Sequence, residues 1–585
     1  MGDRGDSPAG GKPWAWRGIA LLCGVAYGGL TVGSFPPFDL WGLALVAVAP
    51  LAWVAAAGRA RPFSLAFWGA IGTAPFWLFE HWWVRDVSAV GLAPMVIYLY
   101  VYPGLFVWIS ARAARRWPRV SMTLVAPVVW GGLEFLRGRV AFDGYPWYLA
   151  GHPLVGAPGL WLSWAAAYVG AFGVSTLAVV SSGLLADALR GRLGAGQVIG
   201  GVVVIAWAGL GAVLAYEPGD AGTLRVAVVQ TNVPQDNKIG WTPTQRVRDF
   251  ERFLELTREA VAGEPSPDLV VWPETMSPGD TLDPESLETE RAADLVWLLD
   301  GEYRGATSIG STMATETLLL FQQRVGVPML VGATAYDNLR IETDQDGAIR
   351  YDADAIYNAA FVIDGGRVVE PWYDKIHLTP FGEVMPYISL WPWLEKQLLA
   401  IGANGMSFEL AEGTKPVRVH VPTPGGDGVD VATPICFEAT MSGVCRRLVY
   451  ERGRRRAGLM INLTNDGWFG DSTAGRRTHL LCARWRCIEL GTPMVRAANT
   501  GISAVIDARG QVVRDRLDGG GGPDRVDGVL TEDVPLASGA TAYARIGDLA
   551  GWATLAGAGL VLLAGFAGRG PKAPVKAKEG QGPMQ

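Results

Sequence analysis

Residues 198–233 read VIGGVVVIAWAGLGAVLAY-EPGDAGT-LRVAVVQTNV and join two different kinds of polypeptide. The first part, Val198–Tyr216, is an uncharged apolar run of the length that crosses a bilayer as a helix. A short polar linker follows, and Leu224–Val233 is then rich in β-branched residues, which is typical of a buried strand. The junction predicts a membrane-embedded part before Tyr216 and a water-facing part after it.

The composition of the whole chain agrees with this division. Only 18% of the 585 residues are charged, and the mean hydropathy is +0.21. A soluble protein would carry about 25% charged residues. The net charge of −6, with no broad basic patch, argues against a nucleic-acid partner.

Eight apolar runs are predicted to cross the membrane, because each approaches the roughly 20 residues that span a ~30 Å hydrocarbon core. The shortest run ends near Glu134 and Arg137, which we expect to form a structural ion pair. The eight runs are Gly18–Gly33, Leu40–Ala57, Ser64–Trp83, Val90–Ala111, Met122–Leu136, Leu162–Ala186, Val198–Tyr216 and Leu549–Ala567.

The placement of lysine and arginine predicts the orientation of these spans. Cations follow the second, fourth and sixth spans, for example at Arg59, Arg112 and Arg190, and the loops on the opposite side hold fewer. Both termini are therefore expected in the cytoplasm. The predicted domains are a membrane domain with seven spans at 1–216, an extracytoplasmic catalytic domain at 217–546, and a final span with a cytoplasmic tail at 547–585.

Two predicted loops outside the membrane, Phe79–Trp83 and Asp143–Tyr148, are rich in aromatic residues. An interfacial aromatic belt explains both loops. The alternative is that they form the mouth of a groove through which lipid reaches the catalytic domain.

The water-facing part alternates apolar, β-rich runs with helical stretches, which favours an α/β class with buried sheets covered by helices. Strands are predicted at Leu224–Val233, Asp268–Trp272, Pro328–Ala335, Ile356–Asp364, Val429–Ile435, Ala457–Thr464 and Met494–Asp507. Helices are predicted at Pro243–Ala262, Ser286–Leu299, Thr312–Arg324 and Gly475–Leu490.

Three chemically active residues follow the ends of predicted strands. Glu274 ends Val-Val-Trp-Pro-Glu, Lys375 lies in Tyr-Asp-Lys-Ile-His, and Cys436 lies in Pro-Ile-Cys-Phe-Glu. Strand ends hold side chains rigidly at the crevice where α/β folds bind their ligands. The three residues are therefore candidates for one site.

Their chemistry suits acyl transfer. A carboxylate can remove the proton of a thiol, and an ammonium group can stabilise a thiolate and then an oxyanion. If Lys375 lies close to Cys436, we expect the thiol to be alkylated well below pH 8. The alternative, from spacing alone, is that Cys436 is an ordinary buried thiol, as we expect for Cys445, Cys482 and Cys487.

Several motifs resemble the carbon–nitrogen hydrolase (nitrilase) superfamily, whose triad is Glu-Lys-Cys, and more narrowly its membrane-bound apolipoprotein N-acyltransferase family. Trp-Pro-Glu at 272–274 and Ile-Cys-Phe-Glu at 435–438 carry the triad motifs together with Lys375. Six further stretches match that family: 134–138, 144–147, 230–235 with Trp241, 375–386, 465–471 and 496–501.

The resemblance implies an αββα sandwich beside the membrane spans, in the cytoplasmic (inner) membrane of a bacterium. It also implies a two-step reaction without a metal or cofactor. The thiolate of Cys436 would first take an acyl chain from the sn-1 ester of a phospholipid. The N-terminal amine of a diacylglyceryl-cysteine on an apolipoprotein would then take the chain from the thioester.

The resemblance also assigns roles to individual residues. Glu274 would be the general base and Lys375 would support the oxyanion, with Glu383 as a second acid orienting Lys375 or the incoming group. Substrate-contacting positions would be Trp241, Phe437, Glu438 and Trp468.

Two features depart from the family pattern. The residue after the nucleophile is often tyrosine in the family and is Phe437 here, so packing against acyl chains is kept while a hydrogen bond is lost. The segment Ser286–Gln323 is long for its position between the Glu and Lys motifs. A lid, a membrane-touching arm or additional core would each explain it.

Two rival functions remain. A membrane-anchored amidase or nitrilase would hydrolyse small amides, although a single anchor would suffice for it. A non-catalytic scaffold could bind lipoproteins with a degenerate domain, although the intact Glu-Lys-Cys set argues against degeneracy.

Overall fold

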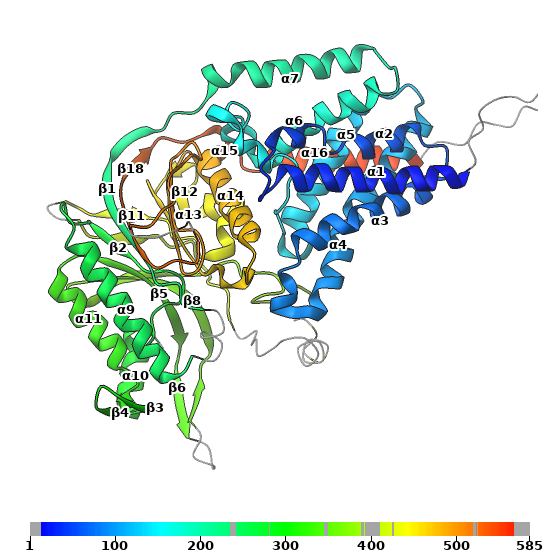
Figure 1. Ribbon diagram of the computed structural model, residues 1–585. Coiled ribbons are helices and arrows are strands. Elements are labelled where there is room, and N and C mark those ends of the chain that lie inside the picture. The colour runs from blue at the N-terminus through cyan, green and yellow to red at the C-terminus, as the bar shows by residue number, and fades with distance from the viewer. Residues whose placement is uncertain are drawn as a thin grey trace, which may run out of the picture.

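The computed structural model describes residues 13–566, except for 235–240, 280, 344–348, 388–390, 392, 394–409, 424–425, 519–521 and 523. Long helices gather in one part of the molecule, and two β-sheets with their covering helices form the other (Figure 1). The chain crosses from the first part to the second between Leu214 and Gly219, and it returns to the helices at Leu549.

The membrane part consists of apolar helices. They are α1 (Pro13–Ser34), α2 (Ala49–Ala57), α3 (Pro62–Glu80), α4 (Val84–Arg116), α5 (Met122–Phe135), α6 (Ala166–Ala188), α7 (Ala195–Leu214) and α16 (Leu549–Phe566). Figure 1 shows α1 to α6 and α16 side by side, whereas α7 runs along the edge of this bundle. We refer to these eight helices as the membrane bundle.

Five of the described helices are long and apolar enough to cross a membrane: Trp14–Ser34, Val90–Arg116, Ala166–Ala188, Ala195–Leu214 and Leu549–Phe566. The remaining predicted spans correspond to the short apolar stretch Trp41–Ala57, to α3 and to α5, which has 14 residues. The chain therefore has several membrane-crossing candidates, and the number eight stays a prediction.

The first sheet has six strands in the order β18-β1-β2-β5-β8-β9. Parallel pairing joins β1 to β2 and β2 to β5, and the other pairs are antiparallel. The strands are β1 (Gly219–Gln230), β2 (Leu269–Val271), β5 (Met329–Asp337), β8 (Ala355–Asp364), β9 (Arg367–Asp374) and β18 (Gly528–Ser538).

The second sheet has four strands in the order β14-β15-β16-β17. These are β14 (Met460–Thr464), β15 (Met494–Ala498), β16 (Ala504–Ile506) and β17 (Val512–Arg514). The single strand predicted at Met494–Asp507 is therefore two antiparallel strands, because the chain turns between Ala498 and Ala504.

Helices cover both sheets and complete four layers. The outer helical layer is α9 (Pro243–Val261), α10 (Pro284–Ala293) and α11 (Met313–Val325), and the inner helical layer is α13 (Ser442–Val449) and α14 (Thr473–Leu490). In Figure 1, α14 lies between the strands and the membrane bundle. A short helix, α15 (Ala542–Ile546), leads into α16.

Alternation along β1 divides the core of this sandwich. Ala227 and Val229 pack in one cluster with Phe253 of α9, whereas Val226 and Val228 pack in another that contains residues of the second sheet. Successive side chains of a strand point to opposite faces, so the first sheet is buried on both sides. The predicted α/β class, with buried sheets covered by helices, is confirmed.

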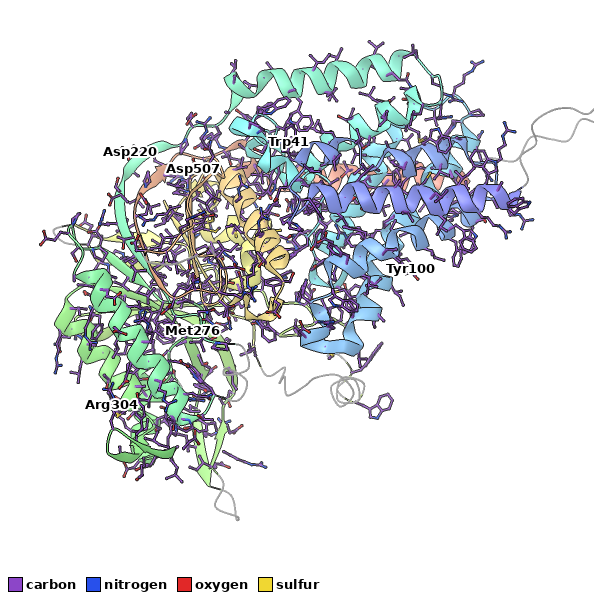
Figure 2. The ribbon with its side chains drawn as sticks, in the orientation of Figure 1. Trp41, Tyr100, Asp220, Met276, Arg304 and Asp507 are labelled. Atoms are coloured by element: carbon purple, nitrogen blue, oxygen red, sulfur yellow. The ribbon has the colours of Figure 1, made fainter. Side chains whose placement is uncertain are left out.

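The segment Ser286–Gln323 differs from its prediction. Helix α10 ends at Ala293, and Leu295–Leu299 does not continue it: β3 (Val296–Tyr303) pairs with β4 (Ala306–Gly310) as a hairpin. Asp294 adopts a left-handed conformation at the helix end, and the apolar run after it alternates in exposure. Arg304, at the hairpin turn, lies at the end of the molecule remote from the membrane bundle (Figure 2).

Three other short strand pairs complete the described structure. They are β6 (Arg340–Thr343) with β7 (Ile349–Asp352), β10 (Val419–Val421) with β11 (Val429–Val431), and β12 (Tyr450–Glu451) with β13 (Arg454–Arg455).

Candidate active site

Glu274, Lys375 and Cys436 meet where strand ends converge between the two sheets. Glu274 follows β2, and Lys375 follows β9 directly. Strand β11 ends earlier than predicted, at Val431, but Ile435 still forms a parallel bridge with Leu463 of β14. Cys436 follows that bridge and begins the 3-10 turn η7 (Cys436–Thr440). Met276, two residues after Glu274, marks this region in Figure 2.

Lys375 is completely buried between two carboxylates. Its Nζ lies 2.6 Å from Oε2 of Glu383 and 3.8 Å from Oε1 of Glu274. Burial lowers the pKa of Lys375, but the charges of Glu383 and Glu274 outweigh burial, so the pKa is raised. Burial raises the pKa of Glu383, the positive charge of Lys375 lowers it, and the overall result is a lowered pKa. Lys375 is therefore a permanent cation and Glu383 its fixed partner.

The Glu274 carboxylate is held by hydrogen bonds on both of its oxygens. Nδ2 of Asn358 donates to Oε1 at 2.7 Å, and the backbone N–H of Asn465 donates to Oε2 at 2.8 Å. The turn that carries Glu274 passes close to Gly332 of β5, where an added Cβ would lie 2.8 Å from the Glu274 Cα. Only glycine at 332 allows this approach.

Cys436 has a backbone φ of +50°, in the left-handed region that non-glycine residues rarely adopt. It is partly exposed, whereas its neighbours Ile435 and Phe437 are buried. Burial and the charge of Glu274 raise the pKa of the Cys436 thiol, and the nearby Lys375 only partly opposes them. This direction runs against the expectation of alkylation well below pH 8, because burial and Glu274 together outweigh Lys375 in setting the pKa of the thiol.

This arrangement suits a thiol that is deprotonated only when it reacts. The Glu274 carboxylate is a base fixed in orientation, and the Lys375 ammonium is a cation that can stabilise an oxyanion nearby. A neutral resting thiol suffices, because the base removes its proton as the sulfur attacks an acyl carbon.

Glu438 does not face an open site. It is fully buried, and its oxygens accept hydrogen bonds from the backbone N–H groups of Ile435, Ile376 and His377, at 2.7, 2.8 and 3.0 Å. The hydroxyl of Tyr373 donates to it as well, at 2.8 Å. Glu438 therefore ties the nucleophile turn to the segment that carries Lys375, which contradicts its assignment to substrate contact.

The other three predicted substrate contacts lie in different surroundings. Phe437 is buried and stacks on the His377 ring, with centroids 6.1 Å apart. Trp241 is partly exposed, and its Nε1 donates to Asp249 at 2.8 Å, on the outer helical layer. Trp468 is partly exposed in the turn η8 (Asp466–Phe469), close in sequence to Asn465.

The aromatic loops of the membrane bundle pack on one another. Nε2 of His81 lies 2.8 Å from the Tyr145 hydroxyl, and the Tyr148 hydroxyl donates to Glu80 at 3.1 Å. Tyr145 also stacks on Trp147, with centroids 5.9 Å apart. The two loops thus pack into one structure, and the interfacial belt and the groove mouth both stay predictions.

This structure contacts the catalytic sandwich directly. Trp83 meets Phe469 with ring centroids 4.8 Å apart, and Trp147 stacks on His479 of α14 at 5.5 Å. The predicted Glu134–Arg137 pair takes other partners: Glu134 accepts from the backbone N–H of Ala150 at 2.8 Å, and Arg137 donates to the Tyr148 carbonyl at 3.3 Å.

The sequence interpretation missed residues that bear on the site. Asn358 lies in the middle of β8 and belongs to no quoted motif, so no local signal marked it. Tyr373 begins the stretch Tyr-Asp-Lys-Ile-His around Lys375 but carried no assigned role. Thr464, Asp466 and Arg496 lie in or beside quoted motifs but carried no assigned role, because their partners are distant in sequence.

Two family profiles match the chain. The profile described as the apolipoprotein N-acyltransferase N-terminal domain matches residues 27–184. The carbon–nitrogen hydrolase profile matches residues 225–543. Together they cover the chain from within α1 to within α6, and from within β1 to the start of α15.

Curated relatives match over nearly the full length. An apolipoprotein N-acyltransferase of Geobacter metallireducens is 29% identical, with 94% of this chain and 95% of the relative covered. One of Bradyrhizobium diazoefficiens is 31% identical, with 92% and 93% covered. Among solved structures, an amidase from Nesterenkonia sp. is 15% identical, with a TM-score of 0.32 and 54% and 92% of the two chains covered.

Proposed function

Because this chain belongs to the apolipoprotein N-acyltransferase family of carbon–nitrogen hydrolases, we propose that it transfers an acyl chain from a phospholipid to the N-terminal amine of a lipoprotein. The reaction proceeds through a thioester on Cys436. The acceptor is the diacylglyceryl-cysteine at the apolipoprotein N-terminus, and the donor ester is the sn-1 ester of a membrane phospholipid.

One observation carries this proposal: a thiol flanked by a carboxylate and an ammonium group lies in a domain packed against membrane helices. Lys375 contacts both Glu274 and Glu383, and all three charges act on the Cys436 thiol. Helix α14 contacts α6 of the membrane bundle on one side and the nucleophile turn η7 on the other. Both substrates are lipids held in a bilayer, so this packing suits them better than it suits small soluble amides.

In the first half of the reaction, the Glu274 carboxylate takes the proton of the Cys436 thiol while the sulfur attacks the ester carbonyl carbon. Lys375 stabilises the oxyanion that forms. The intermediate collapses, the C–O bond to the glycerol breaks, and Glu274 returns the proton to the departing alkoxide. A thioester and a lysophospholipid result.

In the second half, the neutral amine of the acceptor attacks the thioester carbonyl. Glu274 takes a proton from the nitrogen, the C–S bond breaks, and the Cys436 sulfur leaves as a thiolate that recovers the proton from Glu274. An amide is formed, and the enzyme returns to its starting state. No step requires a metal or a cofactor.

The remaining residues support these steps. Glu383, at 2.6 Å from Lys375, fixes the ammonium group toward the oxyanion. Phe437 packs beside the nucleophile, and the partly exposed Trp241 and Trp468 are available to acyl chains at the edge of the sandwich. Glu438 holds the nucleophile turn from inside.

We also propose that the sandwich lies outside the cytoplasmic membrane and that both termini lie in the cytoplasm. The guanidinium of Arg112 donates to the Gly565 carbonyl at 3.5 Å, and that of Arg115 donates to the Ala60 carbonyl. These contacts gather the basic α2–α3 and α4–α5 loops and the end of α16 at one end of the bundle. The catalytic sandwich lies at the other end in Figure 1, as the positive-inside rule requires of an extracytoplasmic domain.

The test is reconstitution of the purified protein with phosphatidylethanolamine and a diacylated lipopeptide, read by mass spectrometry. Triacylated peptide and a fatty-acyl adduct on Cys436 are expected. Cys436→Ala should lose both products, and Cys487→Ala, which removes a buried thiol of α14, should keep both.

The same experiment separates the rival functions. Fatty acid released to water, with no acylated peptide, would identify a hydrolase and sink the proposal. Unchanged lipoprotein acylation in cells that carry only the Cys436→Ala protein would favour a scaffold.

A further inference from the structure

A cluster of charged and polar side chains lies behind Cys436, on the second sheet, in the turn η8 that follows β14, and in α14. It consists of Asn462, Thr464, Asp466, His479 and Arg496, each at most 2% exposed. We call these five residues the rear cluster. The acyl-transfer steps above make no use of it.

An ion pair forms the centre of the rear cluster. Nη2 of Arg496 lies 2.6 and 2.7 Å from the two carboxylate oxygens of Asp466. Nδ1 of His479 lies 3.0 Å from Oδ1 of Asp466. Glycine at 501 leaves room for the Asp466 carboxylate, because a Cβ at position 501 would lie 2.1 Å from Oδ2 of Asp466.

Asn462 connects this ion pair to the backbone of the nucleophile turn. Its Oδ1 accepts from Nη1 of Arg496 at 2.8 Å, which fixes the orientation of the amide. Its Nδ2 then donates to the Pro434 carbonyl at 2.8 Å and reaches the Cys436 carbonyl at 3.5 Å. Both carbonyls flank Ile435, just where the chain enters the left-handed conformation of Cys436.

Thr464 connects the ion pair to the thiol itself. The parallel bridge between Ile435 and Leu463 sets Thr464 beside Cys436, and the Thr464 hydroxyl lowers the pKa of the thiol. The Thr464 hydroxyl also donates to Oδ1 of Asp466 at 3.2 Å. A hydroxyl can rotate between these two partners, because it is both a donor and an acceptor.

We propose that the rear cluster presents the Cys436 sulfur for acyl transfer: Thr464 hydrogen-bonds the thiolate as it forms, while Asp466, Arg496 and Asn462 position Thr464 and the strained Cys436 backbone. This inference rests on the proposed function for its chemistry. Thr464 is the neighbour of the reacting sulfur in this register, whereas Asp466, Arg496 and Asn462 act through other residues.

The cost of burying these charges supports a positioning role. A buried ion pair is often no more stabilising than apolar residues of the same volume, since both ions lose their hydration. Here the pair uses its hydrogen bonds to orient Asn462, which reaches the Cys436 carbonyl, and Thr464, which lies beside Cys436. An ion pair with a purely structural role would not need to orient Asn462 and Thr464.

Charged groups face the thiol from every neighbouring element. Glu274, Lys375 and Glu383 face it from the strand ends of the first sheet and the following loop. The Asp466–Arg496 pair and His479 lie behind it and are neutral as a set when the histidine is uncharged. The pH dependence of the thiol therefore reports on both sides of the site.

The test measures alkylation of Cys436 by iodoacetamide against pH in the full-length protein in detergent micelles, together with acyl transfer. Thr464→Val keeps the shape and removes the hydroxyl. Its alkylation midpoint should move to higher pH by roughly one unit, and its acylation rate should fall about tenfold. Thr464→Ser should restore both values to within about threefold of the unsubstituted protein.

A matched control separates this role from general packing. Thr257→Val removes another buried hydroxyl, on α9, which donates to the Phe253 carbonyl and accepts from Nε1 of Trp272 after β2. It should lower the unfolding temperature and leave the alkylation profile of Cys436 unchanged.

Arg496→Lys tests the positioning residues, because lysine keeps the charge but cannot bind Asn462 and Asp466 together. Its kcat should fall with KM nearly constant. An unchanged alkylation profile in Thr464→Val, or equal losses in the valine and serine variants, would overturn the inference. Since alkylation needs no lipid, failure of acyl transfer in the unsubstituted protein would count against the proposed function alone.

Discussion

The outer and inner helical layers of the catalytic sandwich differ in where their ion pairs lie: these outer pairs are exposed and this inner pair is buried. On the outer layer, Arg252 pairs with Glu255 at 2.6 Å and Arg291 pairs with Glu316 at 2.8 Å, with all four side chains substantially exposed. On the inner layer, Arg486 pairs with Glu489 at 2.6 Å, and these side chains are 3% and 0% exposed.

The difference shows what each layer does. Exposed ion pairs stabilise a folded protein by about 0–1 kcal/mol, so the outer layer is held in place mainly by its apolar contacts. The buried pair of the inner layer has structural partners on both sides. Glu489 accepts from the backbone N–H of Ala171 at 2.7 Å, next to the break in α6 at Gly170, and Arg486 donates to the Thr440 carbonyl at the end of the nucleophile turn. The inner layer thus joins the membrane bundle to the site.

The largest effect is expected from breaking the inner pair. Glu489→Ala leaves Arg486 buried without its partner and orphans the Ala171 N–H, so it should destabilise the fold by about 3–5 kcal/mol. Glu255→Ala on the outer layer should cost less than about 1 kcal/mol. Chemical unfolding in detergent micelles measures both, and similar losses in the two variants would erase the distinction between the layers.

A smaller effect concerns the carboxylates near the thiol. Glu274 raises the pKa of Cys436, so Glu274→Gln should lower that pKa and increase the thiolate fraction at a given pH. Iodoacetamide labelling at pH 9 should then be faster by about tenfold, while acyl transfer is lost with its base. Glu316→Gln on the outer layer should change neither. Slower labelling in Glu274→Gln would mean that Glu274 assists alkylation instead of opposing the thiolate.

The smallest effect is expected at the β3–β4 hairpin beyond the outer layer. Leu298 is 75% exposed, so Leu298→Ser should change the free energy of unfolding by no more than about 0.5 kcal/mol and leave acyl transfer intact. Leu480→Ser, at a buried position of α14, is the matched inner variant and should be clearly destabilising. A large loss of acyl transfer in Leu298→Ser would assign the hairpin a part in the reaction.

Local patterns predicted much of the fold. The β-branched run at 224–233 and the Pro243–Ala262 amphipathic stretch became β1 and α9 nearly as expected, because a strand or helix of that length is decided by its own periodicity. The run Leu295–Leu299 was predicted as helix and is a strand, since pairing with Ala306–Gly310 overrode a pattern too short to distinguish the two.

The candidate site was also predicted only in part from the sequence. Glu274, Lys375, Glu383 and Cys436 were identified from motifs because a nucleophile, a base and a cation are recognisable residue types. The burial of Glu438 was not recognisable, because its four hydrogen-bond donors come from residues 373–377 and 435, which only the packed sheets bring together.

The sequence by itself determined that the chain has apolar helices followed by an α/β domain, and which residue types its chemistry employs. Hydrophobic periodicity and side-chain chemistry are properties of short segments, so no partner is needed to recognise them. Only the tertiary structure decided that Lys375 is shared by two carboxylates, that burial and Glu274 raise the pKa of the Cys436 thiol, and that Thr464, Asp466 and Arg496 stand behind it. Burial and charge balance depend on atoms that are distant in the chain and adjacent only after folding.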